Sequence, residues 1–113
     1  MSAQAQSTRK TVRDMAAAKG ATPLVCLTAY TAPMAALLDE TCDLLLVGDS
    51  VGMVVQGEAN TIPVQLREMA YHTRLVSRAK PKALIVGDLP FGSYQVSAQQ
   101  GVESSIRLMK EGA

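Results

Sequence analysis

Two aspartates stand where they could bind one metal ion together. Asp49 and Asp88 each lie two residues beyond the end of a short apolar segment, and each follows a glycine. If these segments are neighbouring strands of a parallel sheet, both carboxylates lie at the edge where such sheets bind ligands. Carboxylate oxygens are the hard ligands that Mg²⁺ prefers, and a site with few of them leaves room for substrate oxygens. The alternative interpretation is that each aspartate only caps the loop that follows it.

Ser50 follows Asp49 directly, and two roles are open to its hydroxyl. It could donate a hydrogen bond to whatever the metal holds, or it could be a nucleophile, since Gly-Asp-Ser also occurs in GDS-type esterases. A nucleophilic serine needs a histidine that has an acidic partner. The only histidine, His72, falls inside a predicted helix. We therefore interpret His72 as a packing residue and Ser50 as a hydrogen-bond donor, with a GDS-type hydrolase as the alternative.

Three short apolar segments predict the strands that would carry these residues. They span residues 24–28, 44–47 and 83–86, and their composition is typical of strands buried on both faces of a sheet. Helical patterns alternate with them, which predicts an α/β fold with a parallel sheet. Helices are predicted over residues 12–19 and 31–40, and two more after residues 65 and 97. Capping pairs mark three of the starts: Thr11–Asp14, Gln65–Glu68 and Ser97–Gln100.

The two later helices each have an apolar side, which is typical of a helix that packs against a sheet. These sides are formed by Leu66, Met69, Ala70, Thr73 and Val76, and by Val102, Ile106 and Met109. Between residues 50 and 64, the glycines and Pro63 predict a loop. Phe91 and Tyr94 follow Asp88 closely and are interpreted as part of the site or as a lid beside it.

Composition excludes several classes of protein. The 113 residues allow one domain, and 48% hydrophobic residues with 19% charged residues are typical of a folding chain. A net charge of +1 without a basic cluster argues against a nucleic-acid partner, and no apolar run could span a membrane. We predict a disordered lead at residues 1–10 and one domain at 11–113. Cys26 and Cys42 show no CxxC spacing and are interpreted as buried, reduced thiols of a cytoplasmic protein.

Four segments carry a resemblance to a known family. They are VGDSVGMVVQG (47–57), TIPV (61–64), MAYHT (69–73) and IVGDLPFGSY (85–94). In this order and spacing they resemble ketopantoate hydroxymethyltransferase (3-methyl-2-oxobutanoate hydroxymethyltransferase), and the resemblance extends over residues 11–113. The family's tyrosine–aspartate pair after the first strand reads Tyr30-Thr31 here.

The resemblance implies a fold and a set of ligands. The fold is the N-terminal part of a (β/α)₈ TIM barrel of the phosphoenolpyruvate/pyruvate type, with a leading helix and about three βα units, truncated before the fourth strand. Asp49 and Asp88 would bind Mg²⁺, and Asp49, Ser50 and Asp88 would contact the oxo acid. The general base is expected beyond Ala113, so no catalytic residue is assigned.

The resemblance also implies a reaction. A hydroxymethyl group passes from 5,10-methylenetetrahydrofolate to 3-methyl-2-oxobutanoate through a Mg²⁺-stabilised enolate. The product is 2-dehydropantoate, in the first step of pantothenate biosynthesis. The full-length family protein is a homo-oligomer, a decamer, whereas this chain alone is expected to be inactive. The alternatives are a GDS-type serine hydrolase that uses Ser50 and a non-enzymatic truncated fragment.

Overall fold

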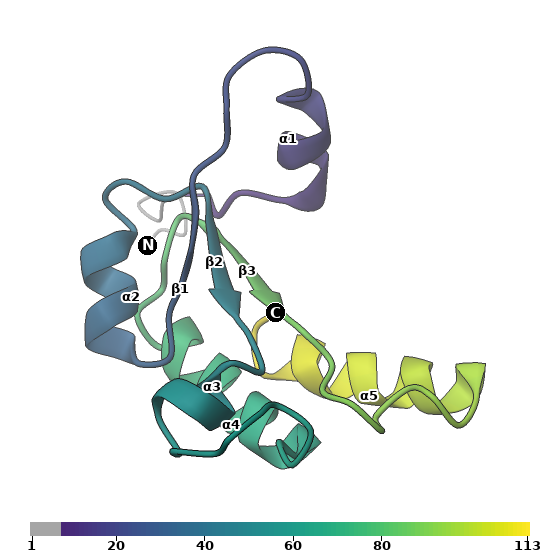
Figure 1. The fold of residues 1–113 in the computed structure, drawn as a ribbon. Helices are drawn as coiled ribbons and strands as arrows, with labels where there is room; N and C mark the ends of the chain where they lie inside the picture. The colour runs from purple at the N-terminus through teal and green to yellow at the C-terminus, as the bar shows by residue number, and fades with distance from the viewer. Residues whose placement is uncertain (1–7) are drawn as a thin grey trace, which may run out of the picture.

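Three strands form one parallel sheet in the order β1-β2-β3, as the sequence pattern predicts. This computed structural model describes residues 8–113. The strands are β1 (Cys26–Thr28), β2 (Leu44–Val47) and β3 (Leu84–Gly87). Because all three run in the same direction, their carboxyl ends meet at one edge of the sheet (Figure 1).

Helix α4 is the central helix of the fold, since it packs against β2, β3, α2 and α5. Figure 1 shows α1 and α3 at opposite ends of the sheet. Within residues 8–113, no helix is both long and apolar enough to span a membrane. The helices described are α1 (Val12–Ala17), α2 (Ala32–Leu38), α3 (Val51–Val54), α4 (Leu66–Ser77) and α5 (Ala98–Lys110).

The predicted apolar side of α4 forms the middle of the core. Met69, Thr73 and Val76 are fully buried, together with Leu45 of β2 and nearly all of Ile85 of β3. Removing the apolar side chains of Met69 and Val76 from water stabilises the packing of α4 on the sheet. The helix therefore has a fixed position from which it can hold other residues.

The predicted helix starts are also confirmed. In each of the three capping pairs, a backbone N–H of one residue donates a hydrogen bond to a side-chain oxygen of the other. The bond satisfies an N–H group at the helix start that has no partner within the helix. The pairs are Thr11–Asp14, Gln65–Glu68 and Ser97–Gln100.

The first strand differs from the prediction. Only Cys26–Thr28 of the predicted segment 24–28 is a strand, and all three of its residues are exposed. The reason is that β1 lies at an edge of the sheet and packs mainly against β2. The prediction that Cys26 is buried is therefore wrong, whereas Cys42 is buried, and both thiols are free.

The last helix also packs with a different side from the predicted one. Ser104 and Leu108 are its buried residues, and the Ser104 hydroxyl donates a hydrogen bond to the Ser93 carbonyl at 2.7 Å. The predicted apolar side therefore does not face the core of the described residues. The exposed residues of that side are Val102, Ile106 and Met109.

Two carboxylates fasten the amino ends of the strands. Asp39, at the end of α2, accepts hydrogen bonds from the backbone N–H groups of Lys82 and Ala83, both at 2.8 Å. Asp43 accepts one from the Val25 backbone at 2.8 Å and forms an ion pair with Lys10. The end of the sheet opposite the candidate site is thus held by side-chain to backbone bonds.

The segment before α1 is attached to the fold where it is described. Residues 1–7 of the predicted lead lie outside the described residues. Arg9 donates a hydrogen bond to the Gly112 carbonyl at 2.7 Å, and the Lys10 backbone N–H donates one to the Lys82 carbonyl at 2.7 Å.

Candidate active site

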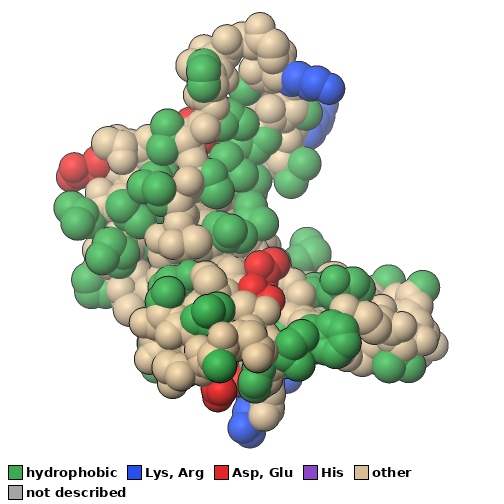
Figure 2. Space-filling model, viewed as in Figure 1, with side chains coloured by type: hydrophobic (Ala, Val, Ile, Leu, Met, Phe, Trp, Pro, Cys, Tyr) green, Lys and Arg blue, Asp and Glu red, His purple; other side chains and the backbone are tan. Residues whose placement is uncertain are grey.

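Asp49 and Asp88 lie side by side at the carboxyl edge of the sheet, as their positions after two strands predict. The Asp49 backbone N–H donates to Asp88 Oδ2 at 3.4 Å, and the Asp88 backbone N–H donates to the Val47 carbonyl at 3.1 Å. Gly48 lies between them, and a Cβ there would make only an ordinary van der Waals contact with Asp88 Oδ2, at 3.4 Å. Figure 2 shows acidic side chains exposed beside the hollow that separates α1 from α5.

The Asp88 carboxyl lacks the partners that its charge requires. It is partly buried, and its second oxygen, Oδ1, is buried without a hydrogen-bond partner among the described residues. Burial raises the pKa of the Asp88 carboxyl above its usual value, and the nearby charge of Asp49 raises it further, against a smaller opposite effect of the Asp49 backbone N–H. A cation between the two carboxylates would favour their ionised forms and so oppose both effects on the pKa of Asp88.

These features fit a hard divalent cation. Two carboxylates, one with a buried oxygen that no group of residues 8–113 satisfies, are the kind of partial ligand set that Mg²⁺ completes with water and substrate oxygens. Within the part of the chain that the structure describes, no group of three or more histidine, cysteine or acidic residues forms a larger metal site. Asp49 and Asp88 are thus two residues at this edge of the sheet that could hold Mg²⁺.

Ser50 begins a short helix that the sequence analysis predicted as loop. It has helical backbone angles, φ −58° and ψ −14°, and its side chain makes no capping bond to α3. Its hydroxyl instead forms a hydrogen bond with the Tyr30 hydroxyl. The turn that carries Ser50 is closed by the Val51 N–H to Gly48 carbonyl bond at 3.1 Å, so Ser50 stays beside Asp49.

Tyr30 is the residue that sequence reasoning did not assign to the site. It follows the last residue of β1 by two positions, the same offset that Asp49 has from β2. The sequence could have indicated Tyr30 through this shared offset. The offset is informative only when β1 is known to end at Thr28 and to pair with β2. Through Ser50, Tyr30 joins the loop after β1 to the loop after β2.

His72 is a packing residue, as predicted, but it also contacts the loop after β1. Its side chain is buried, and its Nδ1 donates a hydrogen bond to the Tyr30 carbonyl at 2.8 Å. The two rings meet edge to face, 6.3 Å apart at an interplanar angle of 87°. The Ser50 hydroxyl bonds the Tyr30 hydroxyl and not the His72 ring, so the geometry does not support a Ser50–His72 nucleophile.

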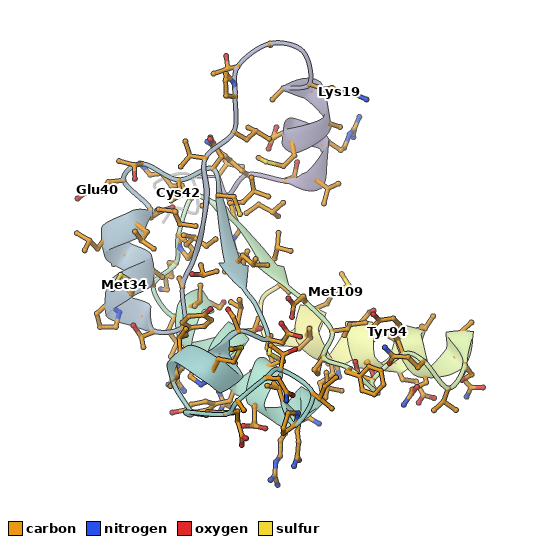
Figure 3. The ribbon with its side chains drawn as sticks, in the orientation of Figure 1. Lys19, Met34, Glu40, Cys42, Tyr94 and Met109 are labelled. Atoms are coloured by element: carbon orange, nitrogen blue, oxygen red, sulfur yellow. The ribbon has the colours of Figure 1, made fainter. Side chains whose placement is uncertain are left out.

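The aromatic residues after Asp88 lie beyond the two carboxylates. Phe91 is exposed and lines a pocket of about 360 Å³ between residues 62–66, the loop at 90–93 and α5. Tyr94 lies over α5 (Figure 3), where a Cβ on Gly101 would be 3.4 Å from the tyrosine Cβ. Both residues thus lie towards α5, and their role as part of the site or as a lid stays a prediction.

Comparison with known proteins identifies the family. Residues 9–113 match the family model described as ketopantoate hydroxymethyltransferase. The 3-methyl-2-oxobutanoate hydroxymethyltransferase of Hyphomonas neptunium is 57% identical over 111 residues, which are 98% of this chain and 40% of the relative. That of Caulobacter vibrioides is 52% identical over 98% of this chain and 41% of the relative. That of Phenylobacterium zucineum is 58% identical over 87% of this chain and 36% of the relative.

The chain therefore spans about 40% of the length of the curated relatives it matches. The match is strong over nearly all of this chain, and it includes the segments that carry Asp49, Ser50 and Asp88. On this similarity, the chain belongs to the ketopantoate hydroxymethyltransferase family.

Proposed function

We propose that this chain provides the Mg²⁺ and oxo-acid site of a 3-methyl-2-oxobutanoate hydroxymethyltransferase. The reaction would transfer a hydroxymethyl group from 5,10-methylenetetrahydrofolate to 3-methyl-2-oxobutanoate and give 2-dehydropantoate for pantothenate synthesis. The observation that carries the proposal is the pairing of Asp88, with its unpartnered buried oxygen, and Asp49 at the carboxyl edge of the sheet. A complete (β/α)₈ barrel and a homodecamer belong to the same proposal.

In this proposal, Asp49 and Asp88 hold Mg²⁺ and Ser50 donates a hydrogen bond to the oxo acid. When bound, Mg²⁺ would supply Lewis-acid polarisation of the keto group. The two carboxylates provide the negative charge that binds the cation, and the Asp49 backbone N–H keeps the Asp88 carboxylate turned towards Asp49. Ser50 fixes the orientation of the oxo acid relative to these carboxylates.

The remaining chemistry would be carbon–carbon bond formation. A base removes the proton from the carbon next to the keto group, and the electron pair left there attacks the one-carbon unit of the folate. Water supplies the hydroxyl oxygen and tetrahydrofolate leaves. We assign no base to this chain, because in this proposal Asp49 and Asp88 bind the cation. A positioned base contributes about 10²- to 10⁴-fold to the rate of such a step, so the chain alone should be inactive.

The hydrolase alternative is less well supported. The partner of the Ser50 hydroxyl is the hydroxyl of Tyr30, and a neutral phenol does not take the serine proton as an imidazole would. His72 is bonded to the Tyr30 backbone instead. The hydrogen bonds of Ser50 therefore favour a donor to substrate over a nucleophile.

Calorimetric titration with Mg²⁺ tests the metal assignment. Asp49→Asn and Asp88→Asn should each weaken Mg²⁺ binding by about tenfold or more, because each removes one of few anionic ligands. Glu103→Gln is the matched control, since it removes an exposed carboxylate on α5. Wild-type affinity in either aspartate variant would show that the residue is not a ligand.

Turnover tests the reaction. The chain is joined to the part of the Hyphomonas neptunium relative that it does not span, and this protein is called the completed enzyme. We expect the completed enzyme to form 2-dehydropantoate with Mg²⁺ and the folate, and the chain alone to form none. Measurable turnover by the chain alone would place a base within it.

A further inference from the structure

We propose that Tyr30 and His72 are positioning residues that hold the Ser50 hydroxyl ready to donate its proton to the bound oxo acid. This inference rests on the proposed function and extends it to two residues outside the metal site. It starts from a chain of contacts: His72 bonds the Tyr30 carbonyl, and the Tyr30 hydroxyl bonds the Ser50 hydroxyl.

The direction of the second bond follows from what each group can donate. A serine hydroxyl carries one proton and can accept further hydrogen bonds. The oxygens of an ionised 2-oxo acid only accept, so Ser50 must give its own proton to them. The Tyr30 hydroxyl then has to be the donor in its bond with Ser50. Each bond of such a series polarises the next, so the Ser50 proton becomes a better donor.

The position of Tyr30 depends on α4 more than on its own strand. β1 has three exposed residues and lies at the edge of the sheet, so it gives the following loop little support. His72 comes from the buried side of α4, and its Nδ1 must donate, because a carbonyl has no proton to give. The 2.8 Å bond and the edge-to-face ring contact thus hold Tyr30 against the core.

Three neighbouring structural units are joined in this way. Tyr30 follows β1, Ser50 follows β2, and His72 lies on α4, which leads to β3. Ser50 is free to take part because its side chain does not cap α3. The contacts therefore set the direction of the Ser50 hydroxyl. The Asp88 carboxylate is held by a different bond, from the Asp49 backbone N–H.

The first test removes only the Tyr30 hydroxyl, by Tyr30→Phe in the completed enzyme. The Michaelis constant for 3-methyl-2-oxobutanoate should rise about three- to tenfold, the effect of one hydrogen bond, with a smaller change in kcat. Mg²⁺ affinity without the oxo acid should not change. Tyr71→Phe is the matched control, because it also removes a tyrosine hydroxyl beside His72. The ring centroids of Tyr71 and His72 are 5.1 Å apart, and Tyr71 is half exposed.

The second test asks whether Tyr30 acts through Ser50. In a double-mutant cycle, Tyr30→Phe should cost little further oxo-acid affinity once Ser50→Ala is present. Losses that simply add would overturn the proposal, as would an unchanged Michaelis constant in Tyr30→Phe. A completed enzyme that binds no oxo acid even as wild type would overturn the proposed function as well, so the two failures are distinguishable.

The third test separates positioning by His72 from a general effect on folding. His72→Leu should raise the Michaelis constant for the oxo acid, and His72→Asn, which keeps an N–H donor near the place of Nδ1, should restore it. Melting temperatures are measured for both variants. A fall in melting temperature in both without a change in the Michaelis constant would show that His72 is only structural.

Discussion

Gly52 and Val64 contact each other so closely that no side chain fits between them: a Cβ on Gly52 would lie 2.3 Å from Val64 Cγ2. Val64 is buried, and its branched side chain has little freedom to move away. This contact packs α3 against the segment that precedes α4. Because Ser50 is the residue before α3, a shift of α3 would also move Ser50.

Gly52→Ala should therefore destabilise the fold by about 1–3 kcal/mol, the usual cost of overpacking a core. It should also weaken oxo-acid binding by the completed enzyme, since α3 must shift. Urea unfolding and a binding titration measure the two effects. Gly101→Ala on α5 is the control, because its Cβ would meet only an ordinary contact at 3.4 Å. Equal stability of the two variants would contradict the packing described for α3.

Asp88 should make the stability of the fold depend on pH, and Mg²⁺ should remove this dependence. Its raised pKa means that the folded state binds the proton more tightly than the unfolded state does. Without a cation, stability should fall as the pH rises from the usual aspartate value through the raised one. Asp88→Asn should remove this fall, and so should Mg²⁺ in the wild type. Urea unfolding from about pH 3.5 to 7, with and without Mg²⁺, measures it. A difference between wild type and variant that does not change with pH would contradict the prediction.

Asp43 should have the opposite pH dependence. Its hydrogen bond with Lys10 is the main cause that lowers the pKa of the Asp43 carboxyl, and the Val25 backbone bond adds to it. The stabilisation is present above the usual pKa and is lost as the pH falls through the lowered one. Asp43→Asn should thus speed hydrogen exchange of the Val25 amide at neutral pH. The effect should disappear in acid, and Asp14→Asn, on the exposed start of α1, should leave Val25 unchanged.

Asp39→Asn should destabilise the entry to β3. The carboxylate accepts from two backbone N–H groups, at Lys82 and Ala83, whereas an amide offers one oxygen and one NH₂ group. One N–H would lose its acceptor, at a cost of about 1–3 kcal/mol in unfolding free energy. Glu40→Gln is the control, because Glu40 is exposed and points away from the strands (Figure 3). A similar small effect of both changes would contradict the role of Asp39.

The residues that follow strands were the part of the site that the sequence could predict. β2 lies at the predicted residues 44–47, and parallel pairing alone brings Asp49 and Asp88 to one edge. The Tyr30–Ser50 bond could not be predicted, because it needs the pairing of β1 with β2 and a helical turn at Ser50. The sequence pattern there showed only a glycine-containing loop.

Burial was predictable where an element lies in the middle of the fold and not where it lies at the edge. The side of α4 that packs is the apolar one, since α4 touches the sheet and two helices. An apolar segment such as the one around Cys26 looks the same in either place. Whether such a segment is exposed depends on the order of strands in the sheet, and the composition of the segment does not predict that order. For α5, the buried residues are Ser104 and Leu108, so the apolar pattern did not indicate the side that packs.

The unpartnered oxygen of Asp88 has a consequence for directed evolution. A library screened for heat resistance without Mg²⁺ would enrich neutral residues at position 88, because they remove a charge that the fold tolerates poorly. Such a screen would select variants with higher thermal stability that have lost the proposed Mg²⁺ ligand. Screening with Mg²⁺ present would retain the aspartate, so the Mg²⁺ concentration in the screen determines which residue is selected at position 88.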